Sequence, residues 1–362
     1  LTDVVEFREP ETYKESLECP ERQEWKHARH CERKALLQRG VMEVVPIPPN
    51  IKPIKSRYVY KRKYNKDGSV KKYKARLVAL GYGQRPGVDV FNTFAPVVKG
   101  VTVRLLLALA FIFNMHVHQL DVTNAFCYAD IEGEVYMAAP PDFNLPVGHC
   151  FKLLKSLYGL LSTSRSWWNH LNAFIKSLHF KPCVLEPCLY HRMYKGELML
   201  LTIYVDDIII SCANLEYVKE VKALFCNTFD MTDMGAMEHF LNVRVTRTKE
   251  SIKLDQSVYV QNVLEKFSEF LGPTNRTKTC PMPSDAADRL STPDKDLTEE
   301  QQRYLDNFPY RSLIGAALYL SMNTRADIAY AVGVLSRHSA SPTLVSCKLL
   351  VYLWQYLRGT AG

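Results

Sequence analysis

The chain has 362 residues, a formal net charge of +8, 47% hydrophobic residues and 23% charged residues. This length suffices for two or three units with their own cores, and the composition is typical of a folded protein rather than a disordered one. The most apolar run, Leu105 to Phe113, is about half of the ~18 residues that a membrane span needs, and the first residues lack the features of a signal peptide. We expect a fragment of a longer intracellular polypeptide.

The first predicted element is an amphipathic helix that ends at Gly40. Its apolar positions recur at helical spacing from Trp25 to Leu36, and the proline-rich residues 46–49 are predicted to be a linker. Two alternating segments, 58–64 and 72–78, then flank Asp67-Gly68, which is a pattern typical of a β-hairpin.

The hairpin region is strongly basic. From Lys52 to Arg76 there are eleven basic residues and one acidic residue, with four tyrosines among them. Such a stretch is either a solvated hairpin or a surface that contacts phosphates without sequence preference. If it binds nucleic acid, the candidate contacts are Lys61, Lys63, Lys71 and Lys72.

The later elements follow from apolar periodicity. Helices are predicted at 101–113, 164–178, 217–229, 258–270, 310–322, 325–336 and 343–357, with Thr324 and Ser341-Pro342 as starts of the last two. Strands are predicted at 116–122, 198–204, 208–212 and 243–248. The segment 281–302 is rich in Pro, Asp, Ser and Thr and is predicted to be a mobile linker.

Two adjacent aspartates, Asp206 and Asp207, join the apolar strands at 198–204 and 208–212. Hairpin turns usually place Gly or Asn where positive φ is needed, and two neighbouring carboxylates repel each other. An ordinary surface turn is one interpretation, and a cation site is the other. Asp121 favours the cation site, because it ends another apolar strand 85 residues earlier. Three carboxylates on neighbouring strands would offer the hard oxygen ligands that Mg²⁺ prefers, with Mn²⁺ as an alternative.

The ten cysteines are scattered among apolar neighbours, which favours reduced, packed thiols over a disulfide framework. Cys183, Cys188 and His191 have spacing that suggests zinc, but a fourth ligand at suitable spacing is missing.

Several sequence blocks now occur in the order found in one family, and the chain resembles the reverse transcriptase of copia-type LTR retrotransposons from Trp25 to almost its last residue. The blocks are residues 73–79 (YKARLVA), 93–97 (TFAPV), 117–122 (VHQLDV), 125–126 (AF), 135–137 (VYM), 155–160 (KSLYGL), 204–207 (YVDD), 324–328 (TRADI) and 356–360 (YLRGT).

The resemblance implies an α+β right-hand polymerase with fingers, an antiparallel palm sheet and a thumb, followed by a helical C-terminal segment. It divides the chain into an N-terminal extension and linker (1–50), fingers and palm (51–250), the thumb start (251–285) and a helical thumb or connection region (286–362) that stops before RNase H. The implied partners are an RNA or DNA template–primer, dNTPs and the rest of a Pol polyprotein, with no membrane. The implied location is cytoplasmic virus-like particles and later the nucleus.

The resemblance also assigns roles. Asp121, Asp206 and Asp207 are implied as catalytic ligands of two Mg²⁺ ions in RNA-directed DNA synthesis. Other residues are implied to contact the dNTP or the nucleic acid. They are Lys74 and Arg76 at the triphosphate, Phe126 against the sugar, Tyr158 and Gly159 beneath the nucleotide or template base, and Arg165 near the template. A plain core position remains the alternative for Phe126, and an RNA-directed RNA polymerase, which has a similar palm, is disfavoured by a bulky ring there.

The chain departs from the family pattern at three places. Residues 161–167 read LSTSRSW where the family has KQAPRxW, Phe126 is followed by Cys-Tyr-Ala rather than Leu-Asn-Gly, and Ser346-Cys347 replaces His-Trp. These changes leave a second hypothesis open: a decayed remnant that binds nucleic acid without catalysis.

Overall fold

The computed structural model describes residues 8–361 except 66–68, 86, 88–89, 91, 274–275 and 291–296. The chain forms two compact units, one from residues 1–98 and 119–234 and the other from 99–118 and 235–362. The predicted Asp67-Gly68 turn lies outside the described residues. Among the helices that are described, none has the length and apolar character needed to cross a membrane.

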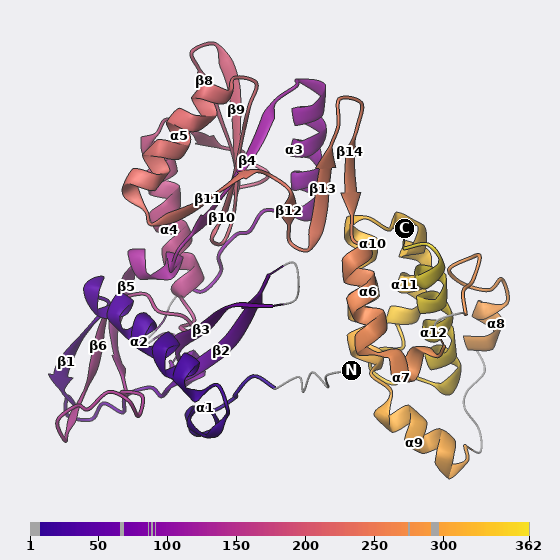
Figure 1. Cartoon of the computed structure of the whole chain (residues 1–362), viewed down its shortest axis with the longest axis horizontal. Coiled ribbons are helices and arrows are strands. Elements are labelled where there is room, and N and C mark those ends of the chain that lie inside the picture. Colours follow the sequence, from indigo (N-terminus) through magenta and orange to yellow (C-terminus); the bar gives the residue numbers. More distant parts are fainter. Residues whose placement is uncertain are drawn as a thin grey trace. The chain divides into compact units, whose positions relative to one another are not determined.

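A six-stranded sheet with the order β11-β4-β10-β9-β8-β7 positions the candidate carboxylates. Its strands are β4 (His116–Val122), β7 (Lys181–Pro182), β8 (Leu189–Tyr194), β9 (Glu197–Tyr204), β10 (Asp207–Cys212) and β11 (Met231–Ala236). The central strands β9 and β10 are buried almost throughout, which explains their continuous apolar sequences. Helices α4 (Thr163–Ser177) and α5 (Leu215–Thr228) lie beside the sheet (Figure 1) and contact each other through Phe174 and Phe225.

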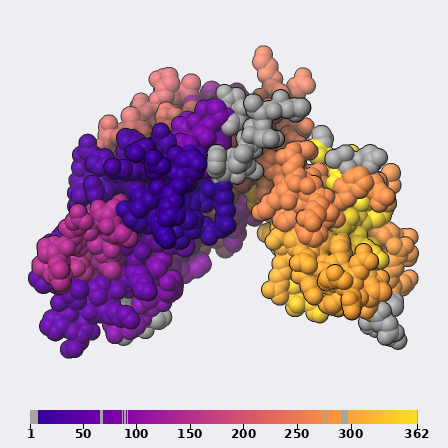
Figure 2. Space-filling model, turned by 60° about the horizontal axis from the view of Figure 1, so that its bottom comes forward, coloured from indigo at the N-terminus to yellow at the C-terminus, as the bar shows by residue number. Residues whose placement is uncertain are grey.

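The rest of the first unit includes a basic hairpin, a three-stranded sheet and two N-terminal helices. Strands β2 (Ser56–Tyr64) and β3 (Val70–Ala79) pair antiparallel, as the predicted hairpin requires. A three-stranded sheet has the order β1-β6-β5, formed by Met42–Pro46, His149–Lys155 and Asp130–Met137. Helices α1 (Tyr13–Glu18) and α2 (Arg22–Gln38) precede these strands. Figure 2 shows this N-terminal part, in indigo, on the surface of the first unit.

Helix α2 packs on the hairpin through its one apolar side. Trp25 is fully buried and meets Tyr60 and Tyr73 edge-to-face, with ring centroids 5.3 and 4.8 Å apart. Strand side chains alternate between two faces. Tyr58, Tyr60, Arg62, Ala75 and Leu77 point to the buried face, whereas Lys61, Lys63, Lys72, Lys74 and Arg76 alternate with them and point to the other face.

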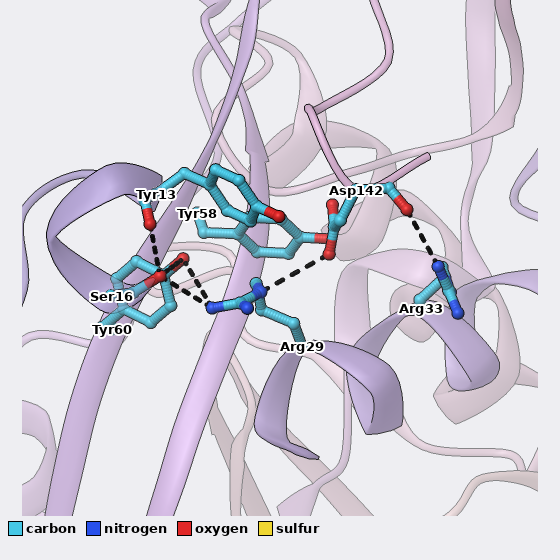
Figure 3. Close-up of polar contacts among 7 residues, drawn as sticks. All are labelled: Tyr13, Ser16, Arg29, Arg33, Tyr58, Tyr60 and Asp142. Atoms are coloured by element: carbon cyan, nitrogen blue, oxygen red, sulfur yellow. Dashed lines mark hydrogen bonds and ion pairs between the residues drawn. The ribbon is translucent and has the colours of Figure 1, made fainter. Parts of the chain in front are cut away.

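A buried polar network ties this helix to the hairpin and to a distant loop (Figure 3). Arg29 is only 3% exposed; its Nη1 donates to Ser16 Oγ at 2.7 Å, and its Nε lies 3.5 Å from a carboxylate oxygen of Asp142. The Tyr58 hydroxyl donates to the same carboxylate at 3.1 Å, and Arg33 donates to the Asp142 backbone carbonyl at 3.0 Å. Because each buried polar group has a partner, the network specifies one arrangement of these segments.

Glu32 fastens the outer edge of β3 to α2. Its Oε1 accepts a hydrogen bond from the Leu77 backbone N–H at 3.2 Å, which satisfies an edge group that a two-stranded hairpin leaves free. Burial raises the pKa of Glu32, although the positive charges of Lys74 and Arg76 act in the opposite direction. The Glu32 carboxylate, which belongs to α2, therefore interacts electrostatically with Lys74 and Arg76, two of the predicted dNTP-binding residues.

The second unit combines a helix, a small sheet and a helical bundle. Its elements are α3 (Gly100–Ile112), η3 (Ala326–Ile328), the β12-β13-β14 sheet (His239–Phe240, Val243–Arg247, Ile252–Asp255), and α6 (Ser257–Lys266), α7 (Ser268–Leu271), α8 (Ala286–Leu290), α9 (Glu299–Asn307), α10 (Tyr310–Asn323), α11 (Ala329–Ser336) and α12 (Leu344–Gly359). The bundle packs around a core that includes the fully buried Leu313, Leu353 and Trp354.

The structure corrects four predictions of local structure. The predicted linker 281–302 contains α8 and the start of α9, which begins because Thr298 and Gln301 form a capping box. Pro46, expected in a linker, ends strand β1 and pairs with His149. Thr324 ends α10 rather than starting a helix, and α12 is capped by Thr343 rather than by Ser341-Pro342. The predicted boundaries at residues 50, 250 and 285 remain predictions, and the two compact units divide the chain differently.

We expect Asp142→Asn to lower the free energy of unfolding by about 3 kcal/mol, because it leaves the buried guanidinium of Arg29 without a counter-charge. The matched control is Asp285→Asn, which breaks the exposed Asp285–Arg289 pair, whose oxygen and nitrogen are 2.6 Å apart. That change is expected to cost less than about 1 kcal/mol. Urea unfolding measures both, and equal costs would contradict the structural role of the network.

A second prediction concerns Glu32. Because its pKa is raised on folding, the folded chain binds this proton more tightly, and stability falls as pH rises between the unfolded and folded pKa values. Glu32→Gln keeps an oxygen for the Leu77 N–H and removes the charge. The variant should therefore gain stability relative to the unsubstituted chain between pH 4 and pH 7, measured by urea unfolding at each pH. A difference that does not change with pH would contradict this explanation.

Candidate active site

The candidate site is built on the tight turn between β9 and β10. Tyr204 pairs with Asp207, so Val205 and Asp206 form the turn itself. Val205 has φ +56°, in the left-handed region that a β-branched residue rarely adopts. The turn is tied to the neighbouring strand, because the Val122 N–H donates to the Asp206 carbonyl at 3.0 Å. A bond from the residue after Asp121 therefore holds the residue that carries the second carboxylate.

Asp121 and Asp206 come close enough to repel each other. Asp121 is half-buried near the end of β4, and its pKa is raised first by this burial and then by the negative charge of Asp206. The cations Lys63, Lys74 and Arg76 lower the same pKa. Two predicted dNTP-binding residues and one predicted nucleic-acid contact therefore favour the charged form of the Asp121 carboxylate.

Asp207 has a different environment. Its Oδ1 accepts a hydrogen bond from Gln119 Nε2 at 2.8 Å, and burial raises the pKa of Asp207 to about 6 in spite of that bond. The negative charges of Asp206 and Asp121 raise it further. Sequence reasoning missed Gln119, although a signal was present: residues two apart on a strand share a face, and Gln119 lies two positions before Asp121.

The donor set fits a hard cation at Asp121 and Asp206. Within the described ranges no group of three or more His, Cys, Asp or Glu side chains is arranged to hold a metal ion. The two carboxylates nevertheless offer oxygen ligands only, which suits Mg²⁺, and a divalent cation between them would offset the repulsion that raises the pKa of Asp121. Because its carboxylate is bonded to Gln119, Asp207 stays a predicted ligand.

One face of the β2–β3 hairpin carries a ladder of like charges. Lys61 lies opposite Lys74, and Lys63 lies opposite Lys72, so each pair shares the face that α2 leaves uncovered. Like charges directly across an antiparallel pair are destabilising. We define the basic face as Lys61, Lys63, Lys72, Lys74 and Arg76.

The other predicted nucleic-acid contacts differ in their surroundings. Lys61 forms an ion pair with Glu9 at 3.1 Å, and Lys71 lies at the register shift between β2 and β3 instead of in the ladder. Arg165, on α4, lies over the Trp168 ring at 5.1 Å. The structure thus groups Lys61, Lys63 and Lys72 with the basic face and places Lys71 and Arg165 outside it.

An aromatic pair adjoins the basic face. The rings of Phe126 and Tyr158 meet edge-to-face at 4.9 Å, and the Arg76 guanidinium lies 5.1 Å from the Tyr158 ring centroid. Tyr158 is fixed through its backbone, because its carbonyl accepts the Ala79 N–H at 2.8 Å. Gly159 is required there: it has φ +90°, and a Cβ would approach the Ala79 carbonyl oxygen to 2.1 Å. Phe126 is only partly buried, and its role at the sugar stays a prediction.

The residues that depart from the family pattern are accommodated locally. The Leu161 N–H donates to Gln84 Oε1 at 2.8 Å, and Thr163 Oγ1 donates to the Leu157 carbonyl at 2.6 Å. Ser346 forms a capping box with Thr343 at the start of α12. These substitutions are compatible with an ordered fold.

Comparisons with known proteins show which family the chain is similar to. A family model described as reverse transcriptase (RNA-dependent DNA polymerase) matches residues 39–283. The chain is 34% identical, over 99% of its length, to the retrovirus-related Pol polyprotein from transposon TNT 1-94 of Nicotiana tabacum, and covers 27% of that protein. It is 32% identical, over 93% of its length, to the corresponding polyprotein from transposon RE1 of Arabidopsis thaliana, and covers 22% of it.

Among solved structures, a foamy viral protease-reverse transcriptase in complex with double-stranded DNA has a TM-score of 0.38 and 14% identity, covering 82% of this chain and 48% of that one. This similarity is too distant to support a conclusion. The chain spans about a quarter of the length of the transposon polyproteins that it matches. The extent of the family match and of these two alignments is decisive: the chain belongs to the reverse transcriptase (RNA-dependent DNA polymerase) family, in the branch of copia-type retrotransposon Pol polyproteins.

Proposed function

We propose that this chain is an RNA-directed DNA polymerase that transfers nucleotides from dNTPs to a primer 3′-hydroxyl at Asp121 and Asp206. The observation that carries the proposal is the mutual placement of these two half-buried carboxylates with the cations Lys63, Lys74 and Arg76. Repelling anions that are held beside a cluster of cations form a site suited to metal ions and phosphates.

The acidic residues and the basic residues of the site would bind different groups: the acidic ones divalent ions, and the basic ones the triphosphate. Asp121 and Asp206 would hold the divalent ions, with Asp207 as a further candidate ligand. When bound, a pair of such ions supplies activation of the attacking hydroxyl and stabilisation of the leaving pyrophosphate. Lys74 and Arg76 would bind the triphosphate, where fixed positive charges offset the charge of the phosphates.

The aromatic pair would select the sugar. Phe126 packs on Tyr158, and the Arg76 guanidinium lies over the Tyr158 ring, so the Phe126 ring is held beside one of the proposed triphosphate cations. A bulky ring there would clash with a 2′-hydroxyl and favour dNTPs over rNTPs. Tyr158 and Gly159 would lie beneath the incoming nucleotide or the template base.

The competing hypothesis is a remnant that binds nucleic acid but has lost catalysis. The local bonds of Leu161 and Thr163 keep the altered segment packed against its surroundings, which both hypotheses allow, so an activity measurement must separate them.

Primer extension on an RNA template with Mg²⁺ and dNTPs tests the proposal. We expect extension by the unsubstituted chain. The extension rate of Asp206→Asn should be lower by at least about 100-fold, since that change removes a proposed ligand of the ions that stabilise the charge developing in the reaction. Template–primer affinity should change little in the variant. Tight binding of template–primer by the unsubstituted chain without any extension would favour the remnant.

The basic face makes a separate prediction about template binding. Replacing Lys63 and Lys72 by Gln should weaken binding and reduce the slope of log affinity against log salt by about 1.4 to 1.8, since each phosphate contact contributes about 0.7 to 0.9. Fluorescence anisotropy at several salt concentrations measures the slope. The matched control is Lys176→Gln with Lys181→Gln, exposed lysines outside the basic face, for which the slope should not change. An unchanged slope in the first variant would mean that the basic face is solvated surface.

A further inference from the structure

Both backbone carbonyls of the β9–β10 turn are held by donors from other elements. The Val205 carbonyl accepts the indole N–H of Trp167 at 2.6 Å, and the Asp206 carbonyl accepts the Val122 N–H at 3.0 Å. The first donor comes from α4 and the second from β4. A turn that is fixed on both peptides has little freedom to move its carboxylate.

The turn has a conformation that needs such support. Val205 has φ +56°, and a β-branched side chain disfavours this left-handed backbone. Because the strained residue directly precedes Asp206, relaxation of Val205 would turn the following peptide and shift the Asp206 carboxylate relative to Asp121. The bond from Trp167 opposes that relaxation at the strained residue itself.

Trp167 is in turn fixed by its surroundings. It is 1% exposed, and three rings pack around it: Tyr128 at 6.2 Å, His170 at 6.1 Å and Phe229 at 5.7 Å between centroids. A side chain so enclosed holds one rotamer, so its N–H has a fixed position before any substrate binds.

Further hydrogen bonds connect the surroundings of Trp167, through Tyr128 and Asp230, to the end of the strand that carries Asp121. The Tyr128 hydroxyl accepts the Asp230 N–H at 2.6 Å, and the Asp230 carbonyl accepts the Thr123 N–H at 2.8 Å. Thr123 directly follows Val122, the donor to the Asp206 carbonyl. Arg39 contacts both Asp230 and Tyr128: it forms an ion pair with Asp230 at 2.8 Å and lies over the aromatic ring of Tyr128 at 5.2 Å. The two candidate metal-binding carboxylates are thus joined by a second route, through side chains, besides the sheet.

We propose that Trp167 is a positioning residue for the polymerase reaction, because its indole N–H holds the Val205 carbonyl and thereby keeps Asp206 in place beside Asp121. This inference rests on the proposed function for its kinetic consequence, but its effect on cation binding can be measured without catalysis. Trp167 touches neither substrate nor metal in this role and acts through the backbone of the turn.

Trp167→Phe tests the proposal, since phenylalanine keeps an aromatic ring and lacks the N–H. We expect Mn²⁺ binding to the free chain, followed by electron paramagnetic resonance, to weaken by about 10-fold, the scale on which supporting residues affect metal sites. In primer extension, kcat should fall by about 10- to 100-fold, while KM for dNTP and the Kd for template–primer stay within about two-fold. More Mg²⁺ should be needed for half-maximal rate.

Trp354→Phe is the matched control. Trp354 is also fully buried, in the helical core of the second unit, and its indole nitrogen has no hydrogen-bond partner among the described residues. This variant should show the same loss of packing without any change in Mn²⁺ affinity or kcat. If Trp167→Phe fails to fold, Tyr128→Phe replaces it, because it removes only the hydroxyl that accepts the Asp230 N–H, and a several-fold loss of Mn²⁺ affinity is expected.

The outcomes separate this inference from the proposed function. Weaker Mn²⁺ binding in Trp167→Phe supports the positioning role even if the unsubstituted chain extends no primer, which would count against the polymerase alone. Mn²⁺ affinity and kcat within two-fold of the unsubstituted chain would overturn the positioning role and leave the polymerase standing. An equal loss of Mn²⁺ affinity in Trp354→Phe would also overturn it, because the effect would then be one of general packing.

Discussion

The repulsion between Asp121 and Asp206 is the interaction on which the rest of the first unit depends. Burial and like charge both raise the pKa of Asp121, so bringing these carboxylates together costs free energy that other parts of the fold must supply. The sheet supplies part of it by pairing β4 beside β10, and the Val122 bond fixes the turn. Cations on the basic face supply another part, and a bound divalent ion would relieve the remainder. A site that is unfavourable when empty is well suited to bind cations and phosphates.

The basic face depends on the N-terminal helices in the same way. Its lysines stand opposite one another across the hairpin, so the hairpin must be held by its other face. Trp25, Arg29 and Glu32 of α2 provide that hold through ring packing, the buried ion pair with Asp142 and the bond to the Leu77 N–H. The N-terminal segment is therefore part of the same structure as the hairpin, rather than an appendage to it.

Sequence reasoning predicted the elements whose periodicity is strong. The β4, β9 and β10 strands and helices α2, α3 and α4 lie within a few residues of the expected positions, because apolar runs and clear ends mark them. Strands β1, β5 and β6 were missed, since their sequences lack a regular apolar–polar alternation. The helices in 281–302 were missed because polar composition hides a capping box. In the site, Asp121 and the Asp206–Asp207 pair stood out as carboxylates between apolar strands. Glu32 and Trp167 did not, because their roles arise from contacts between distant segments that only tertiary structure brings together, whereas Gln119 could have been found from its position on the same strand face as Asp121.

The central claim is that Asp121 and Asp206 together form the cation site of a polymerase. The most direct measurement is crystallography of the chain with template–primer, a dNTP analogue and Mn²⁺, with the metal located by anomalous scattering. We expect an anomalous peak between the carboxylates of Asp121 and Asp206, within about 2.0–2.3 Å of an oxygen of each, as is usual for such ions on oxygen ligands. A complex with ordered nucleic acid and nucleotide, but with no peak between those two carboxylates, would contradict it.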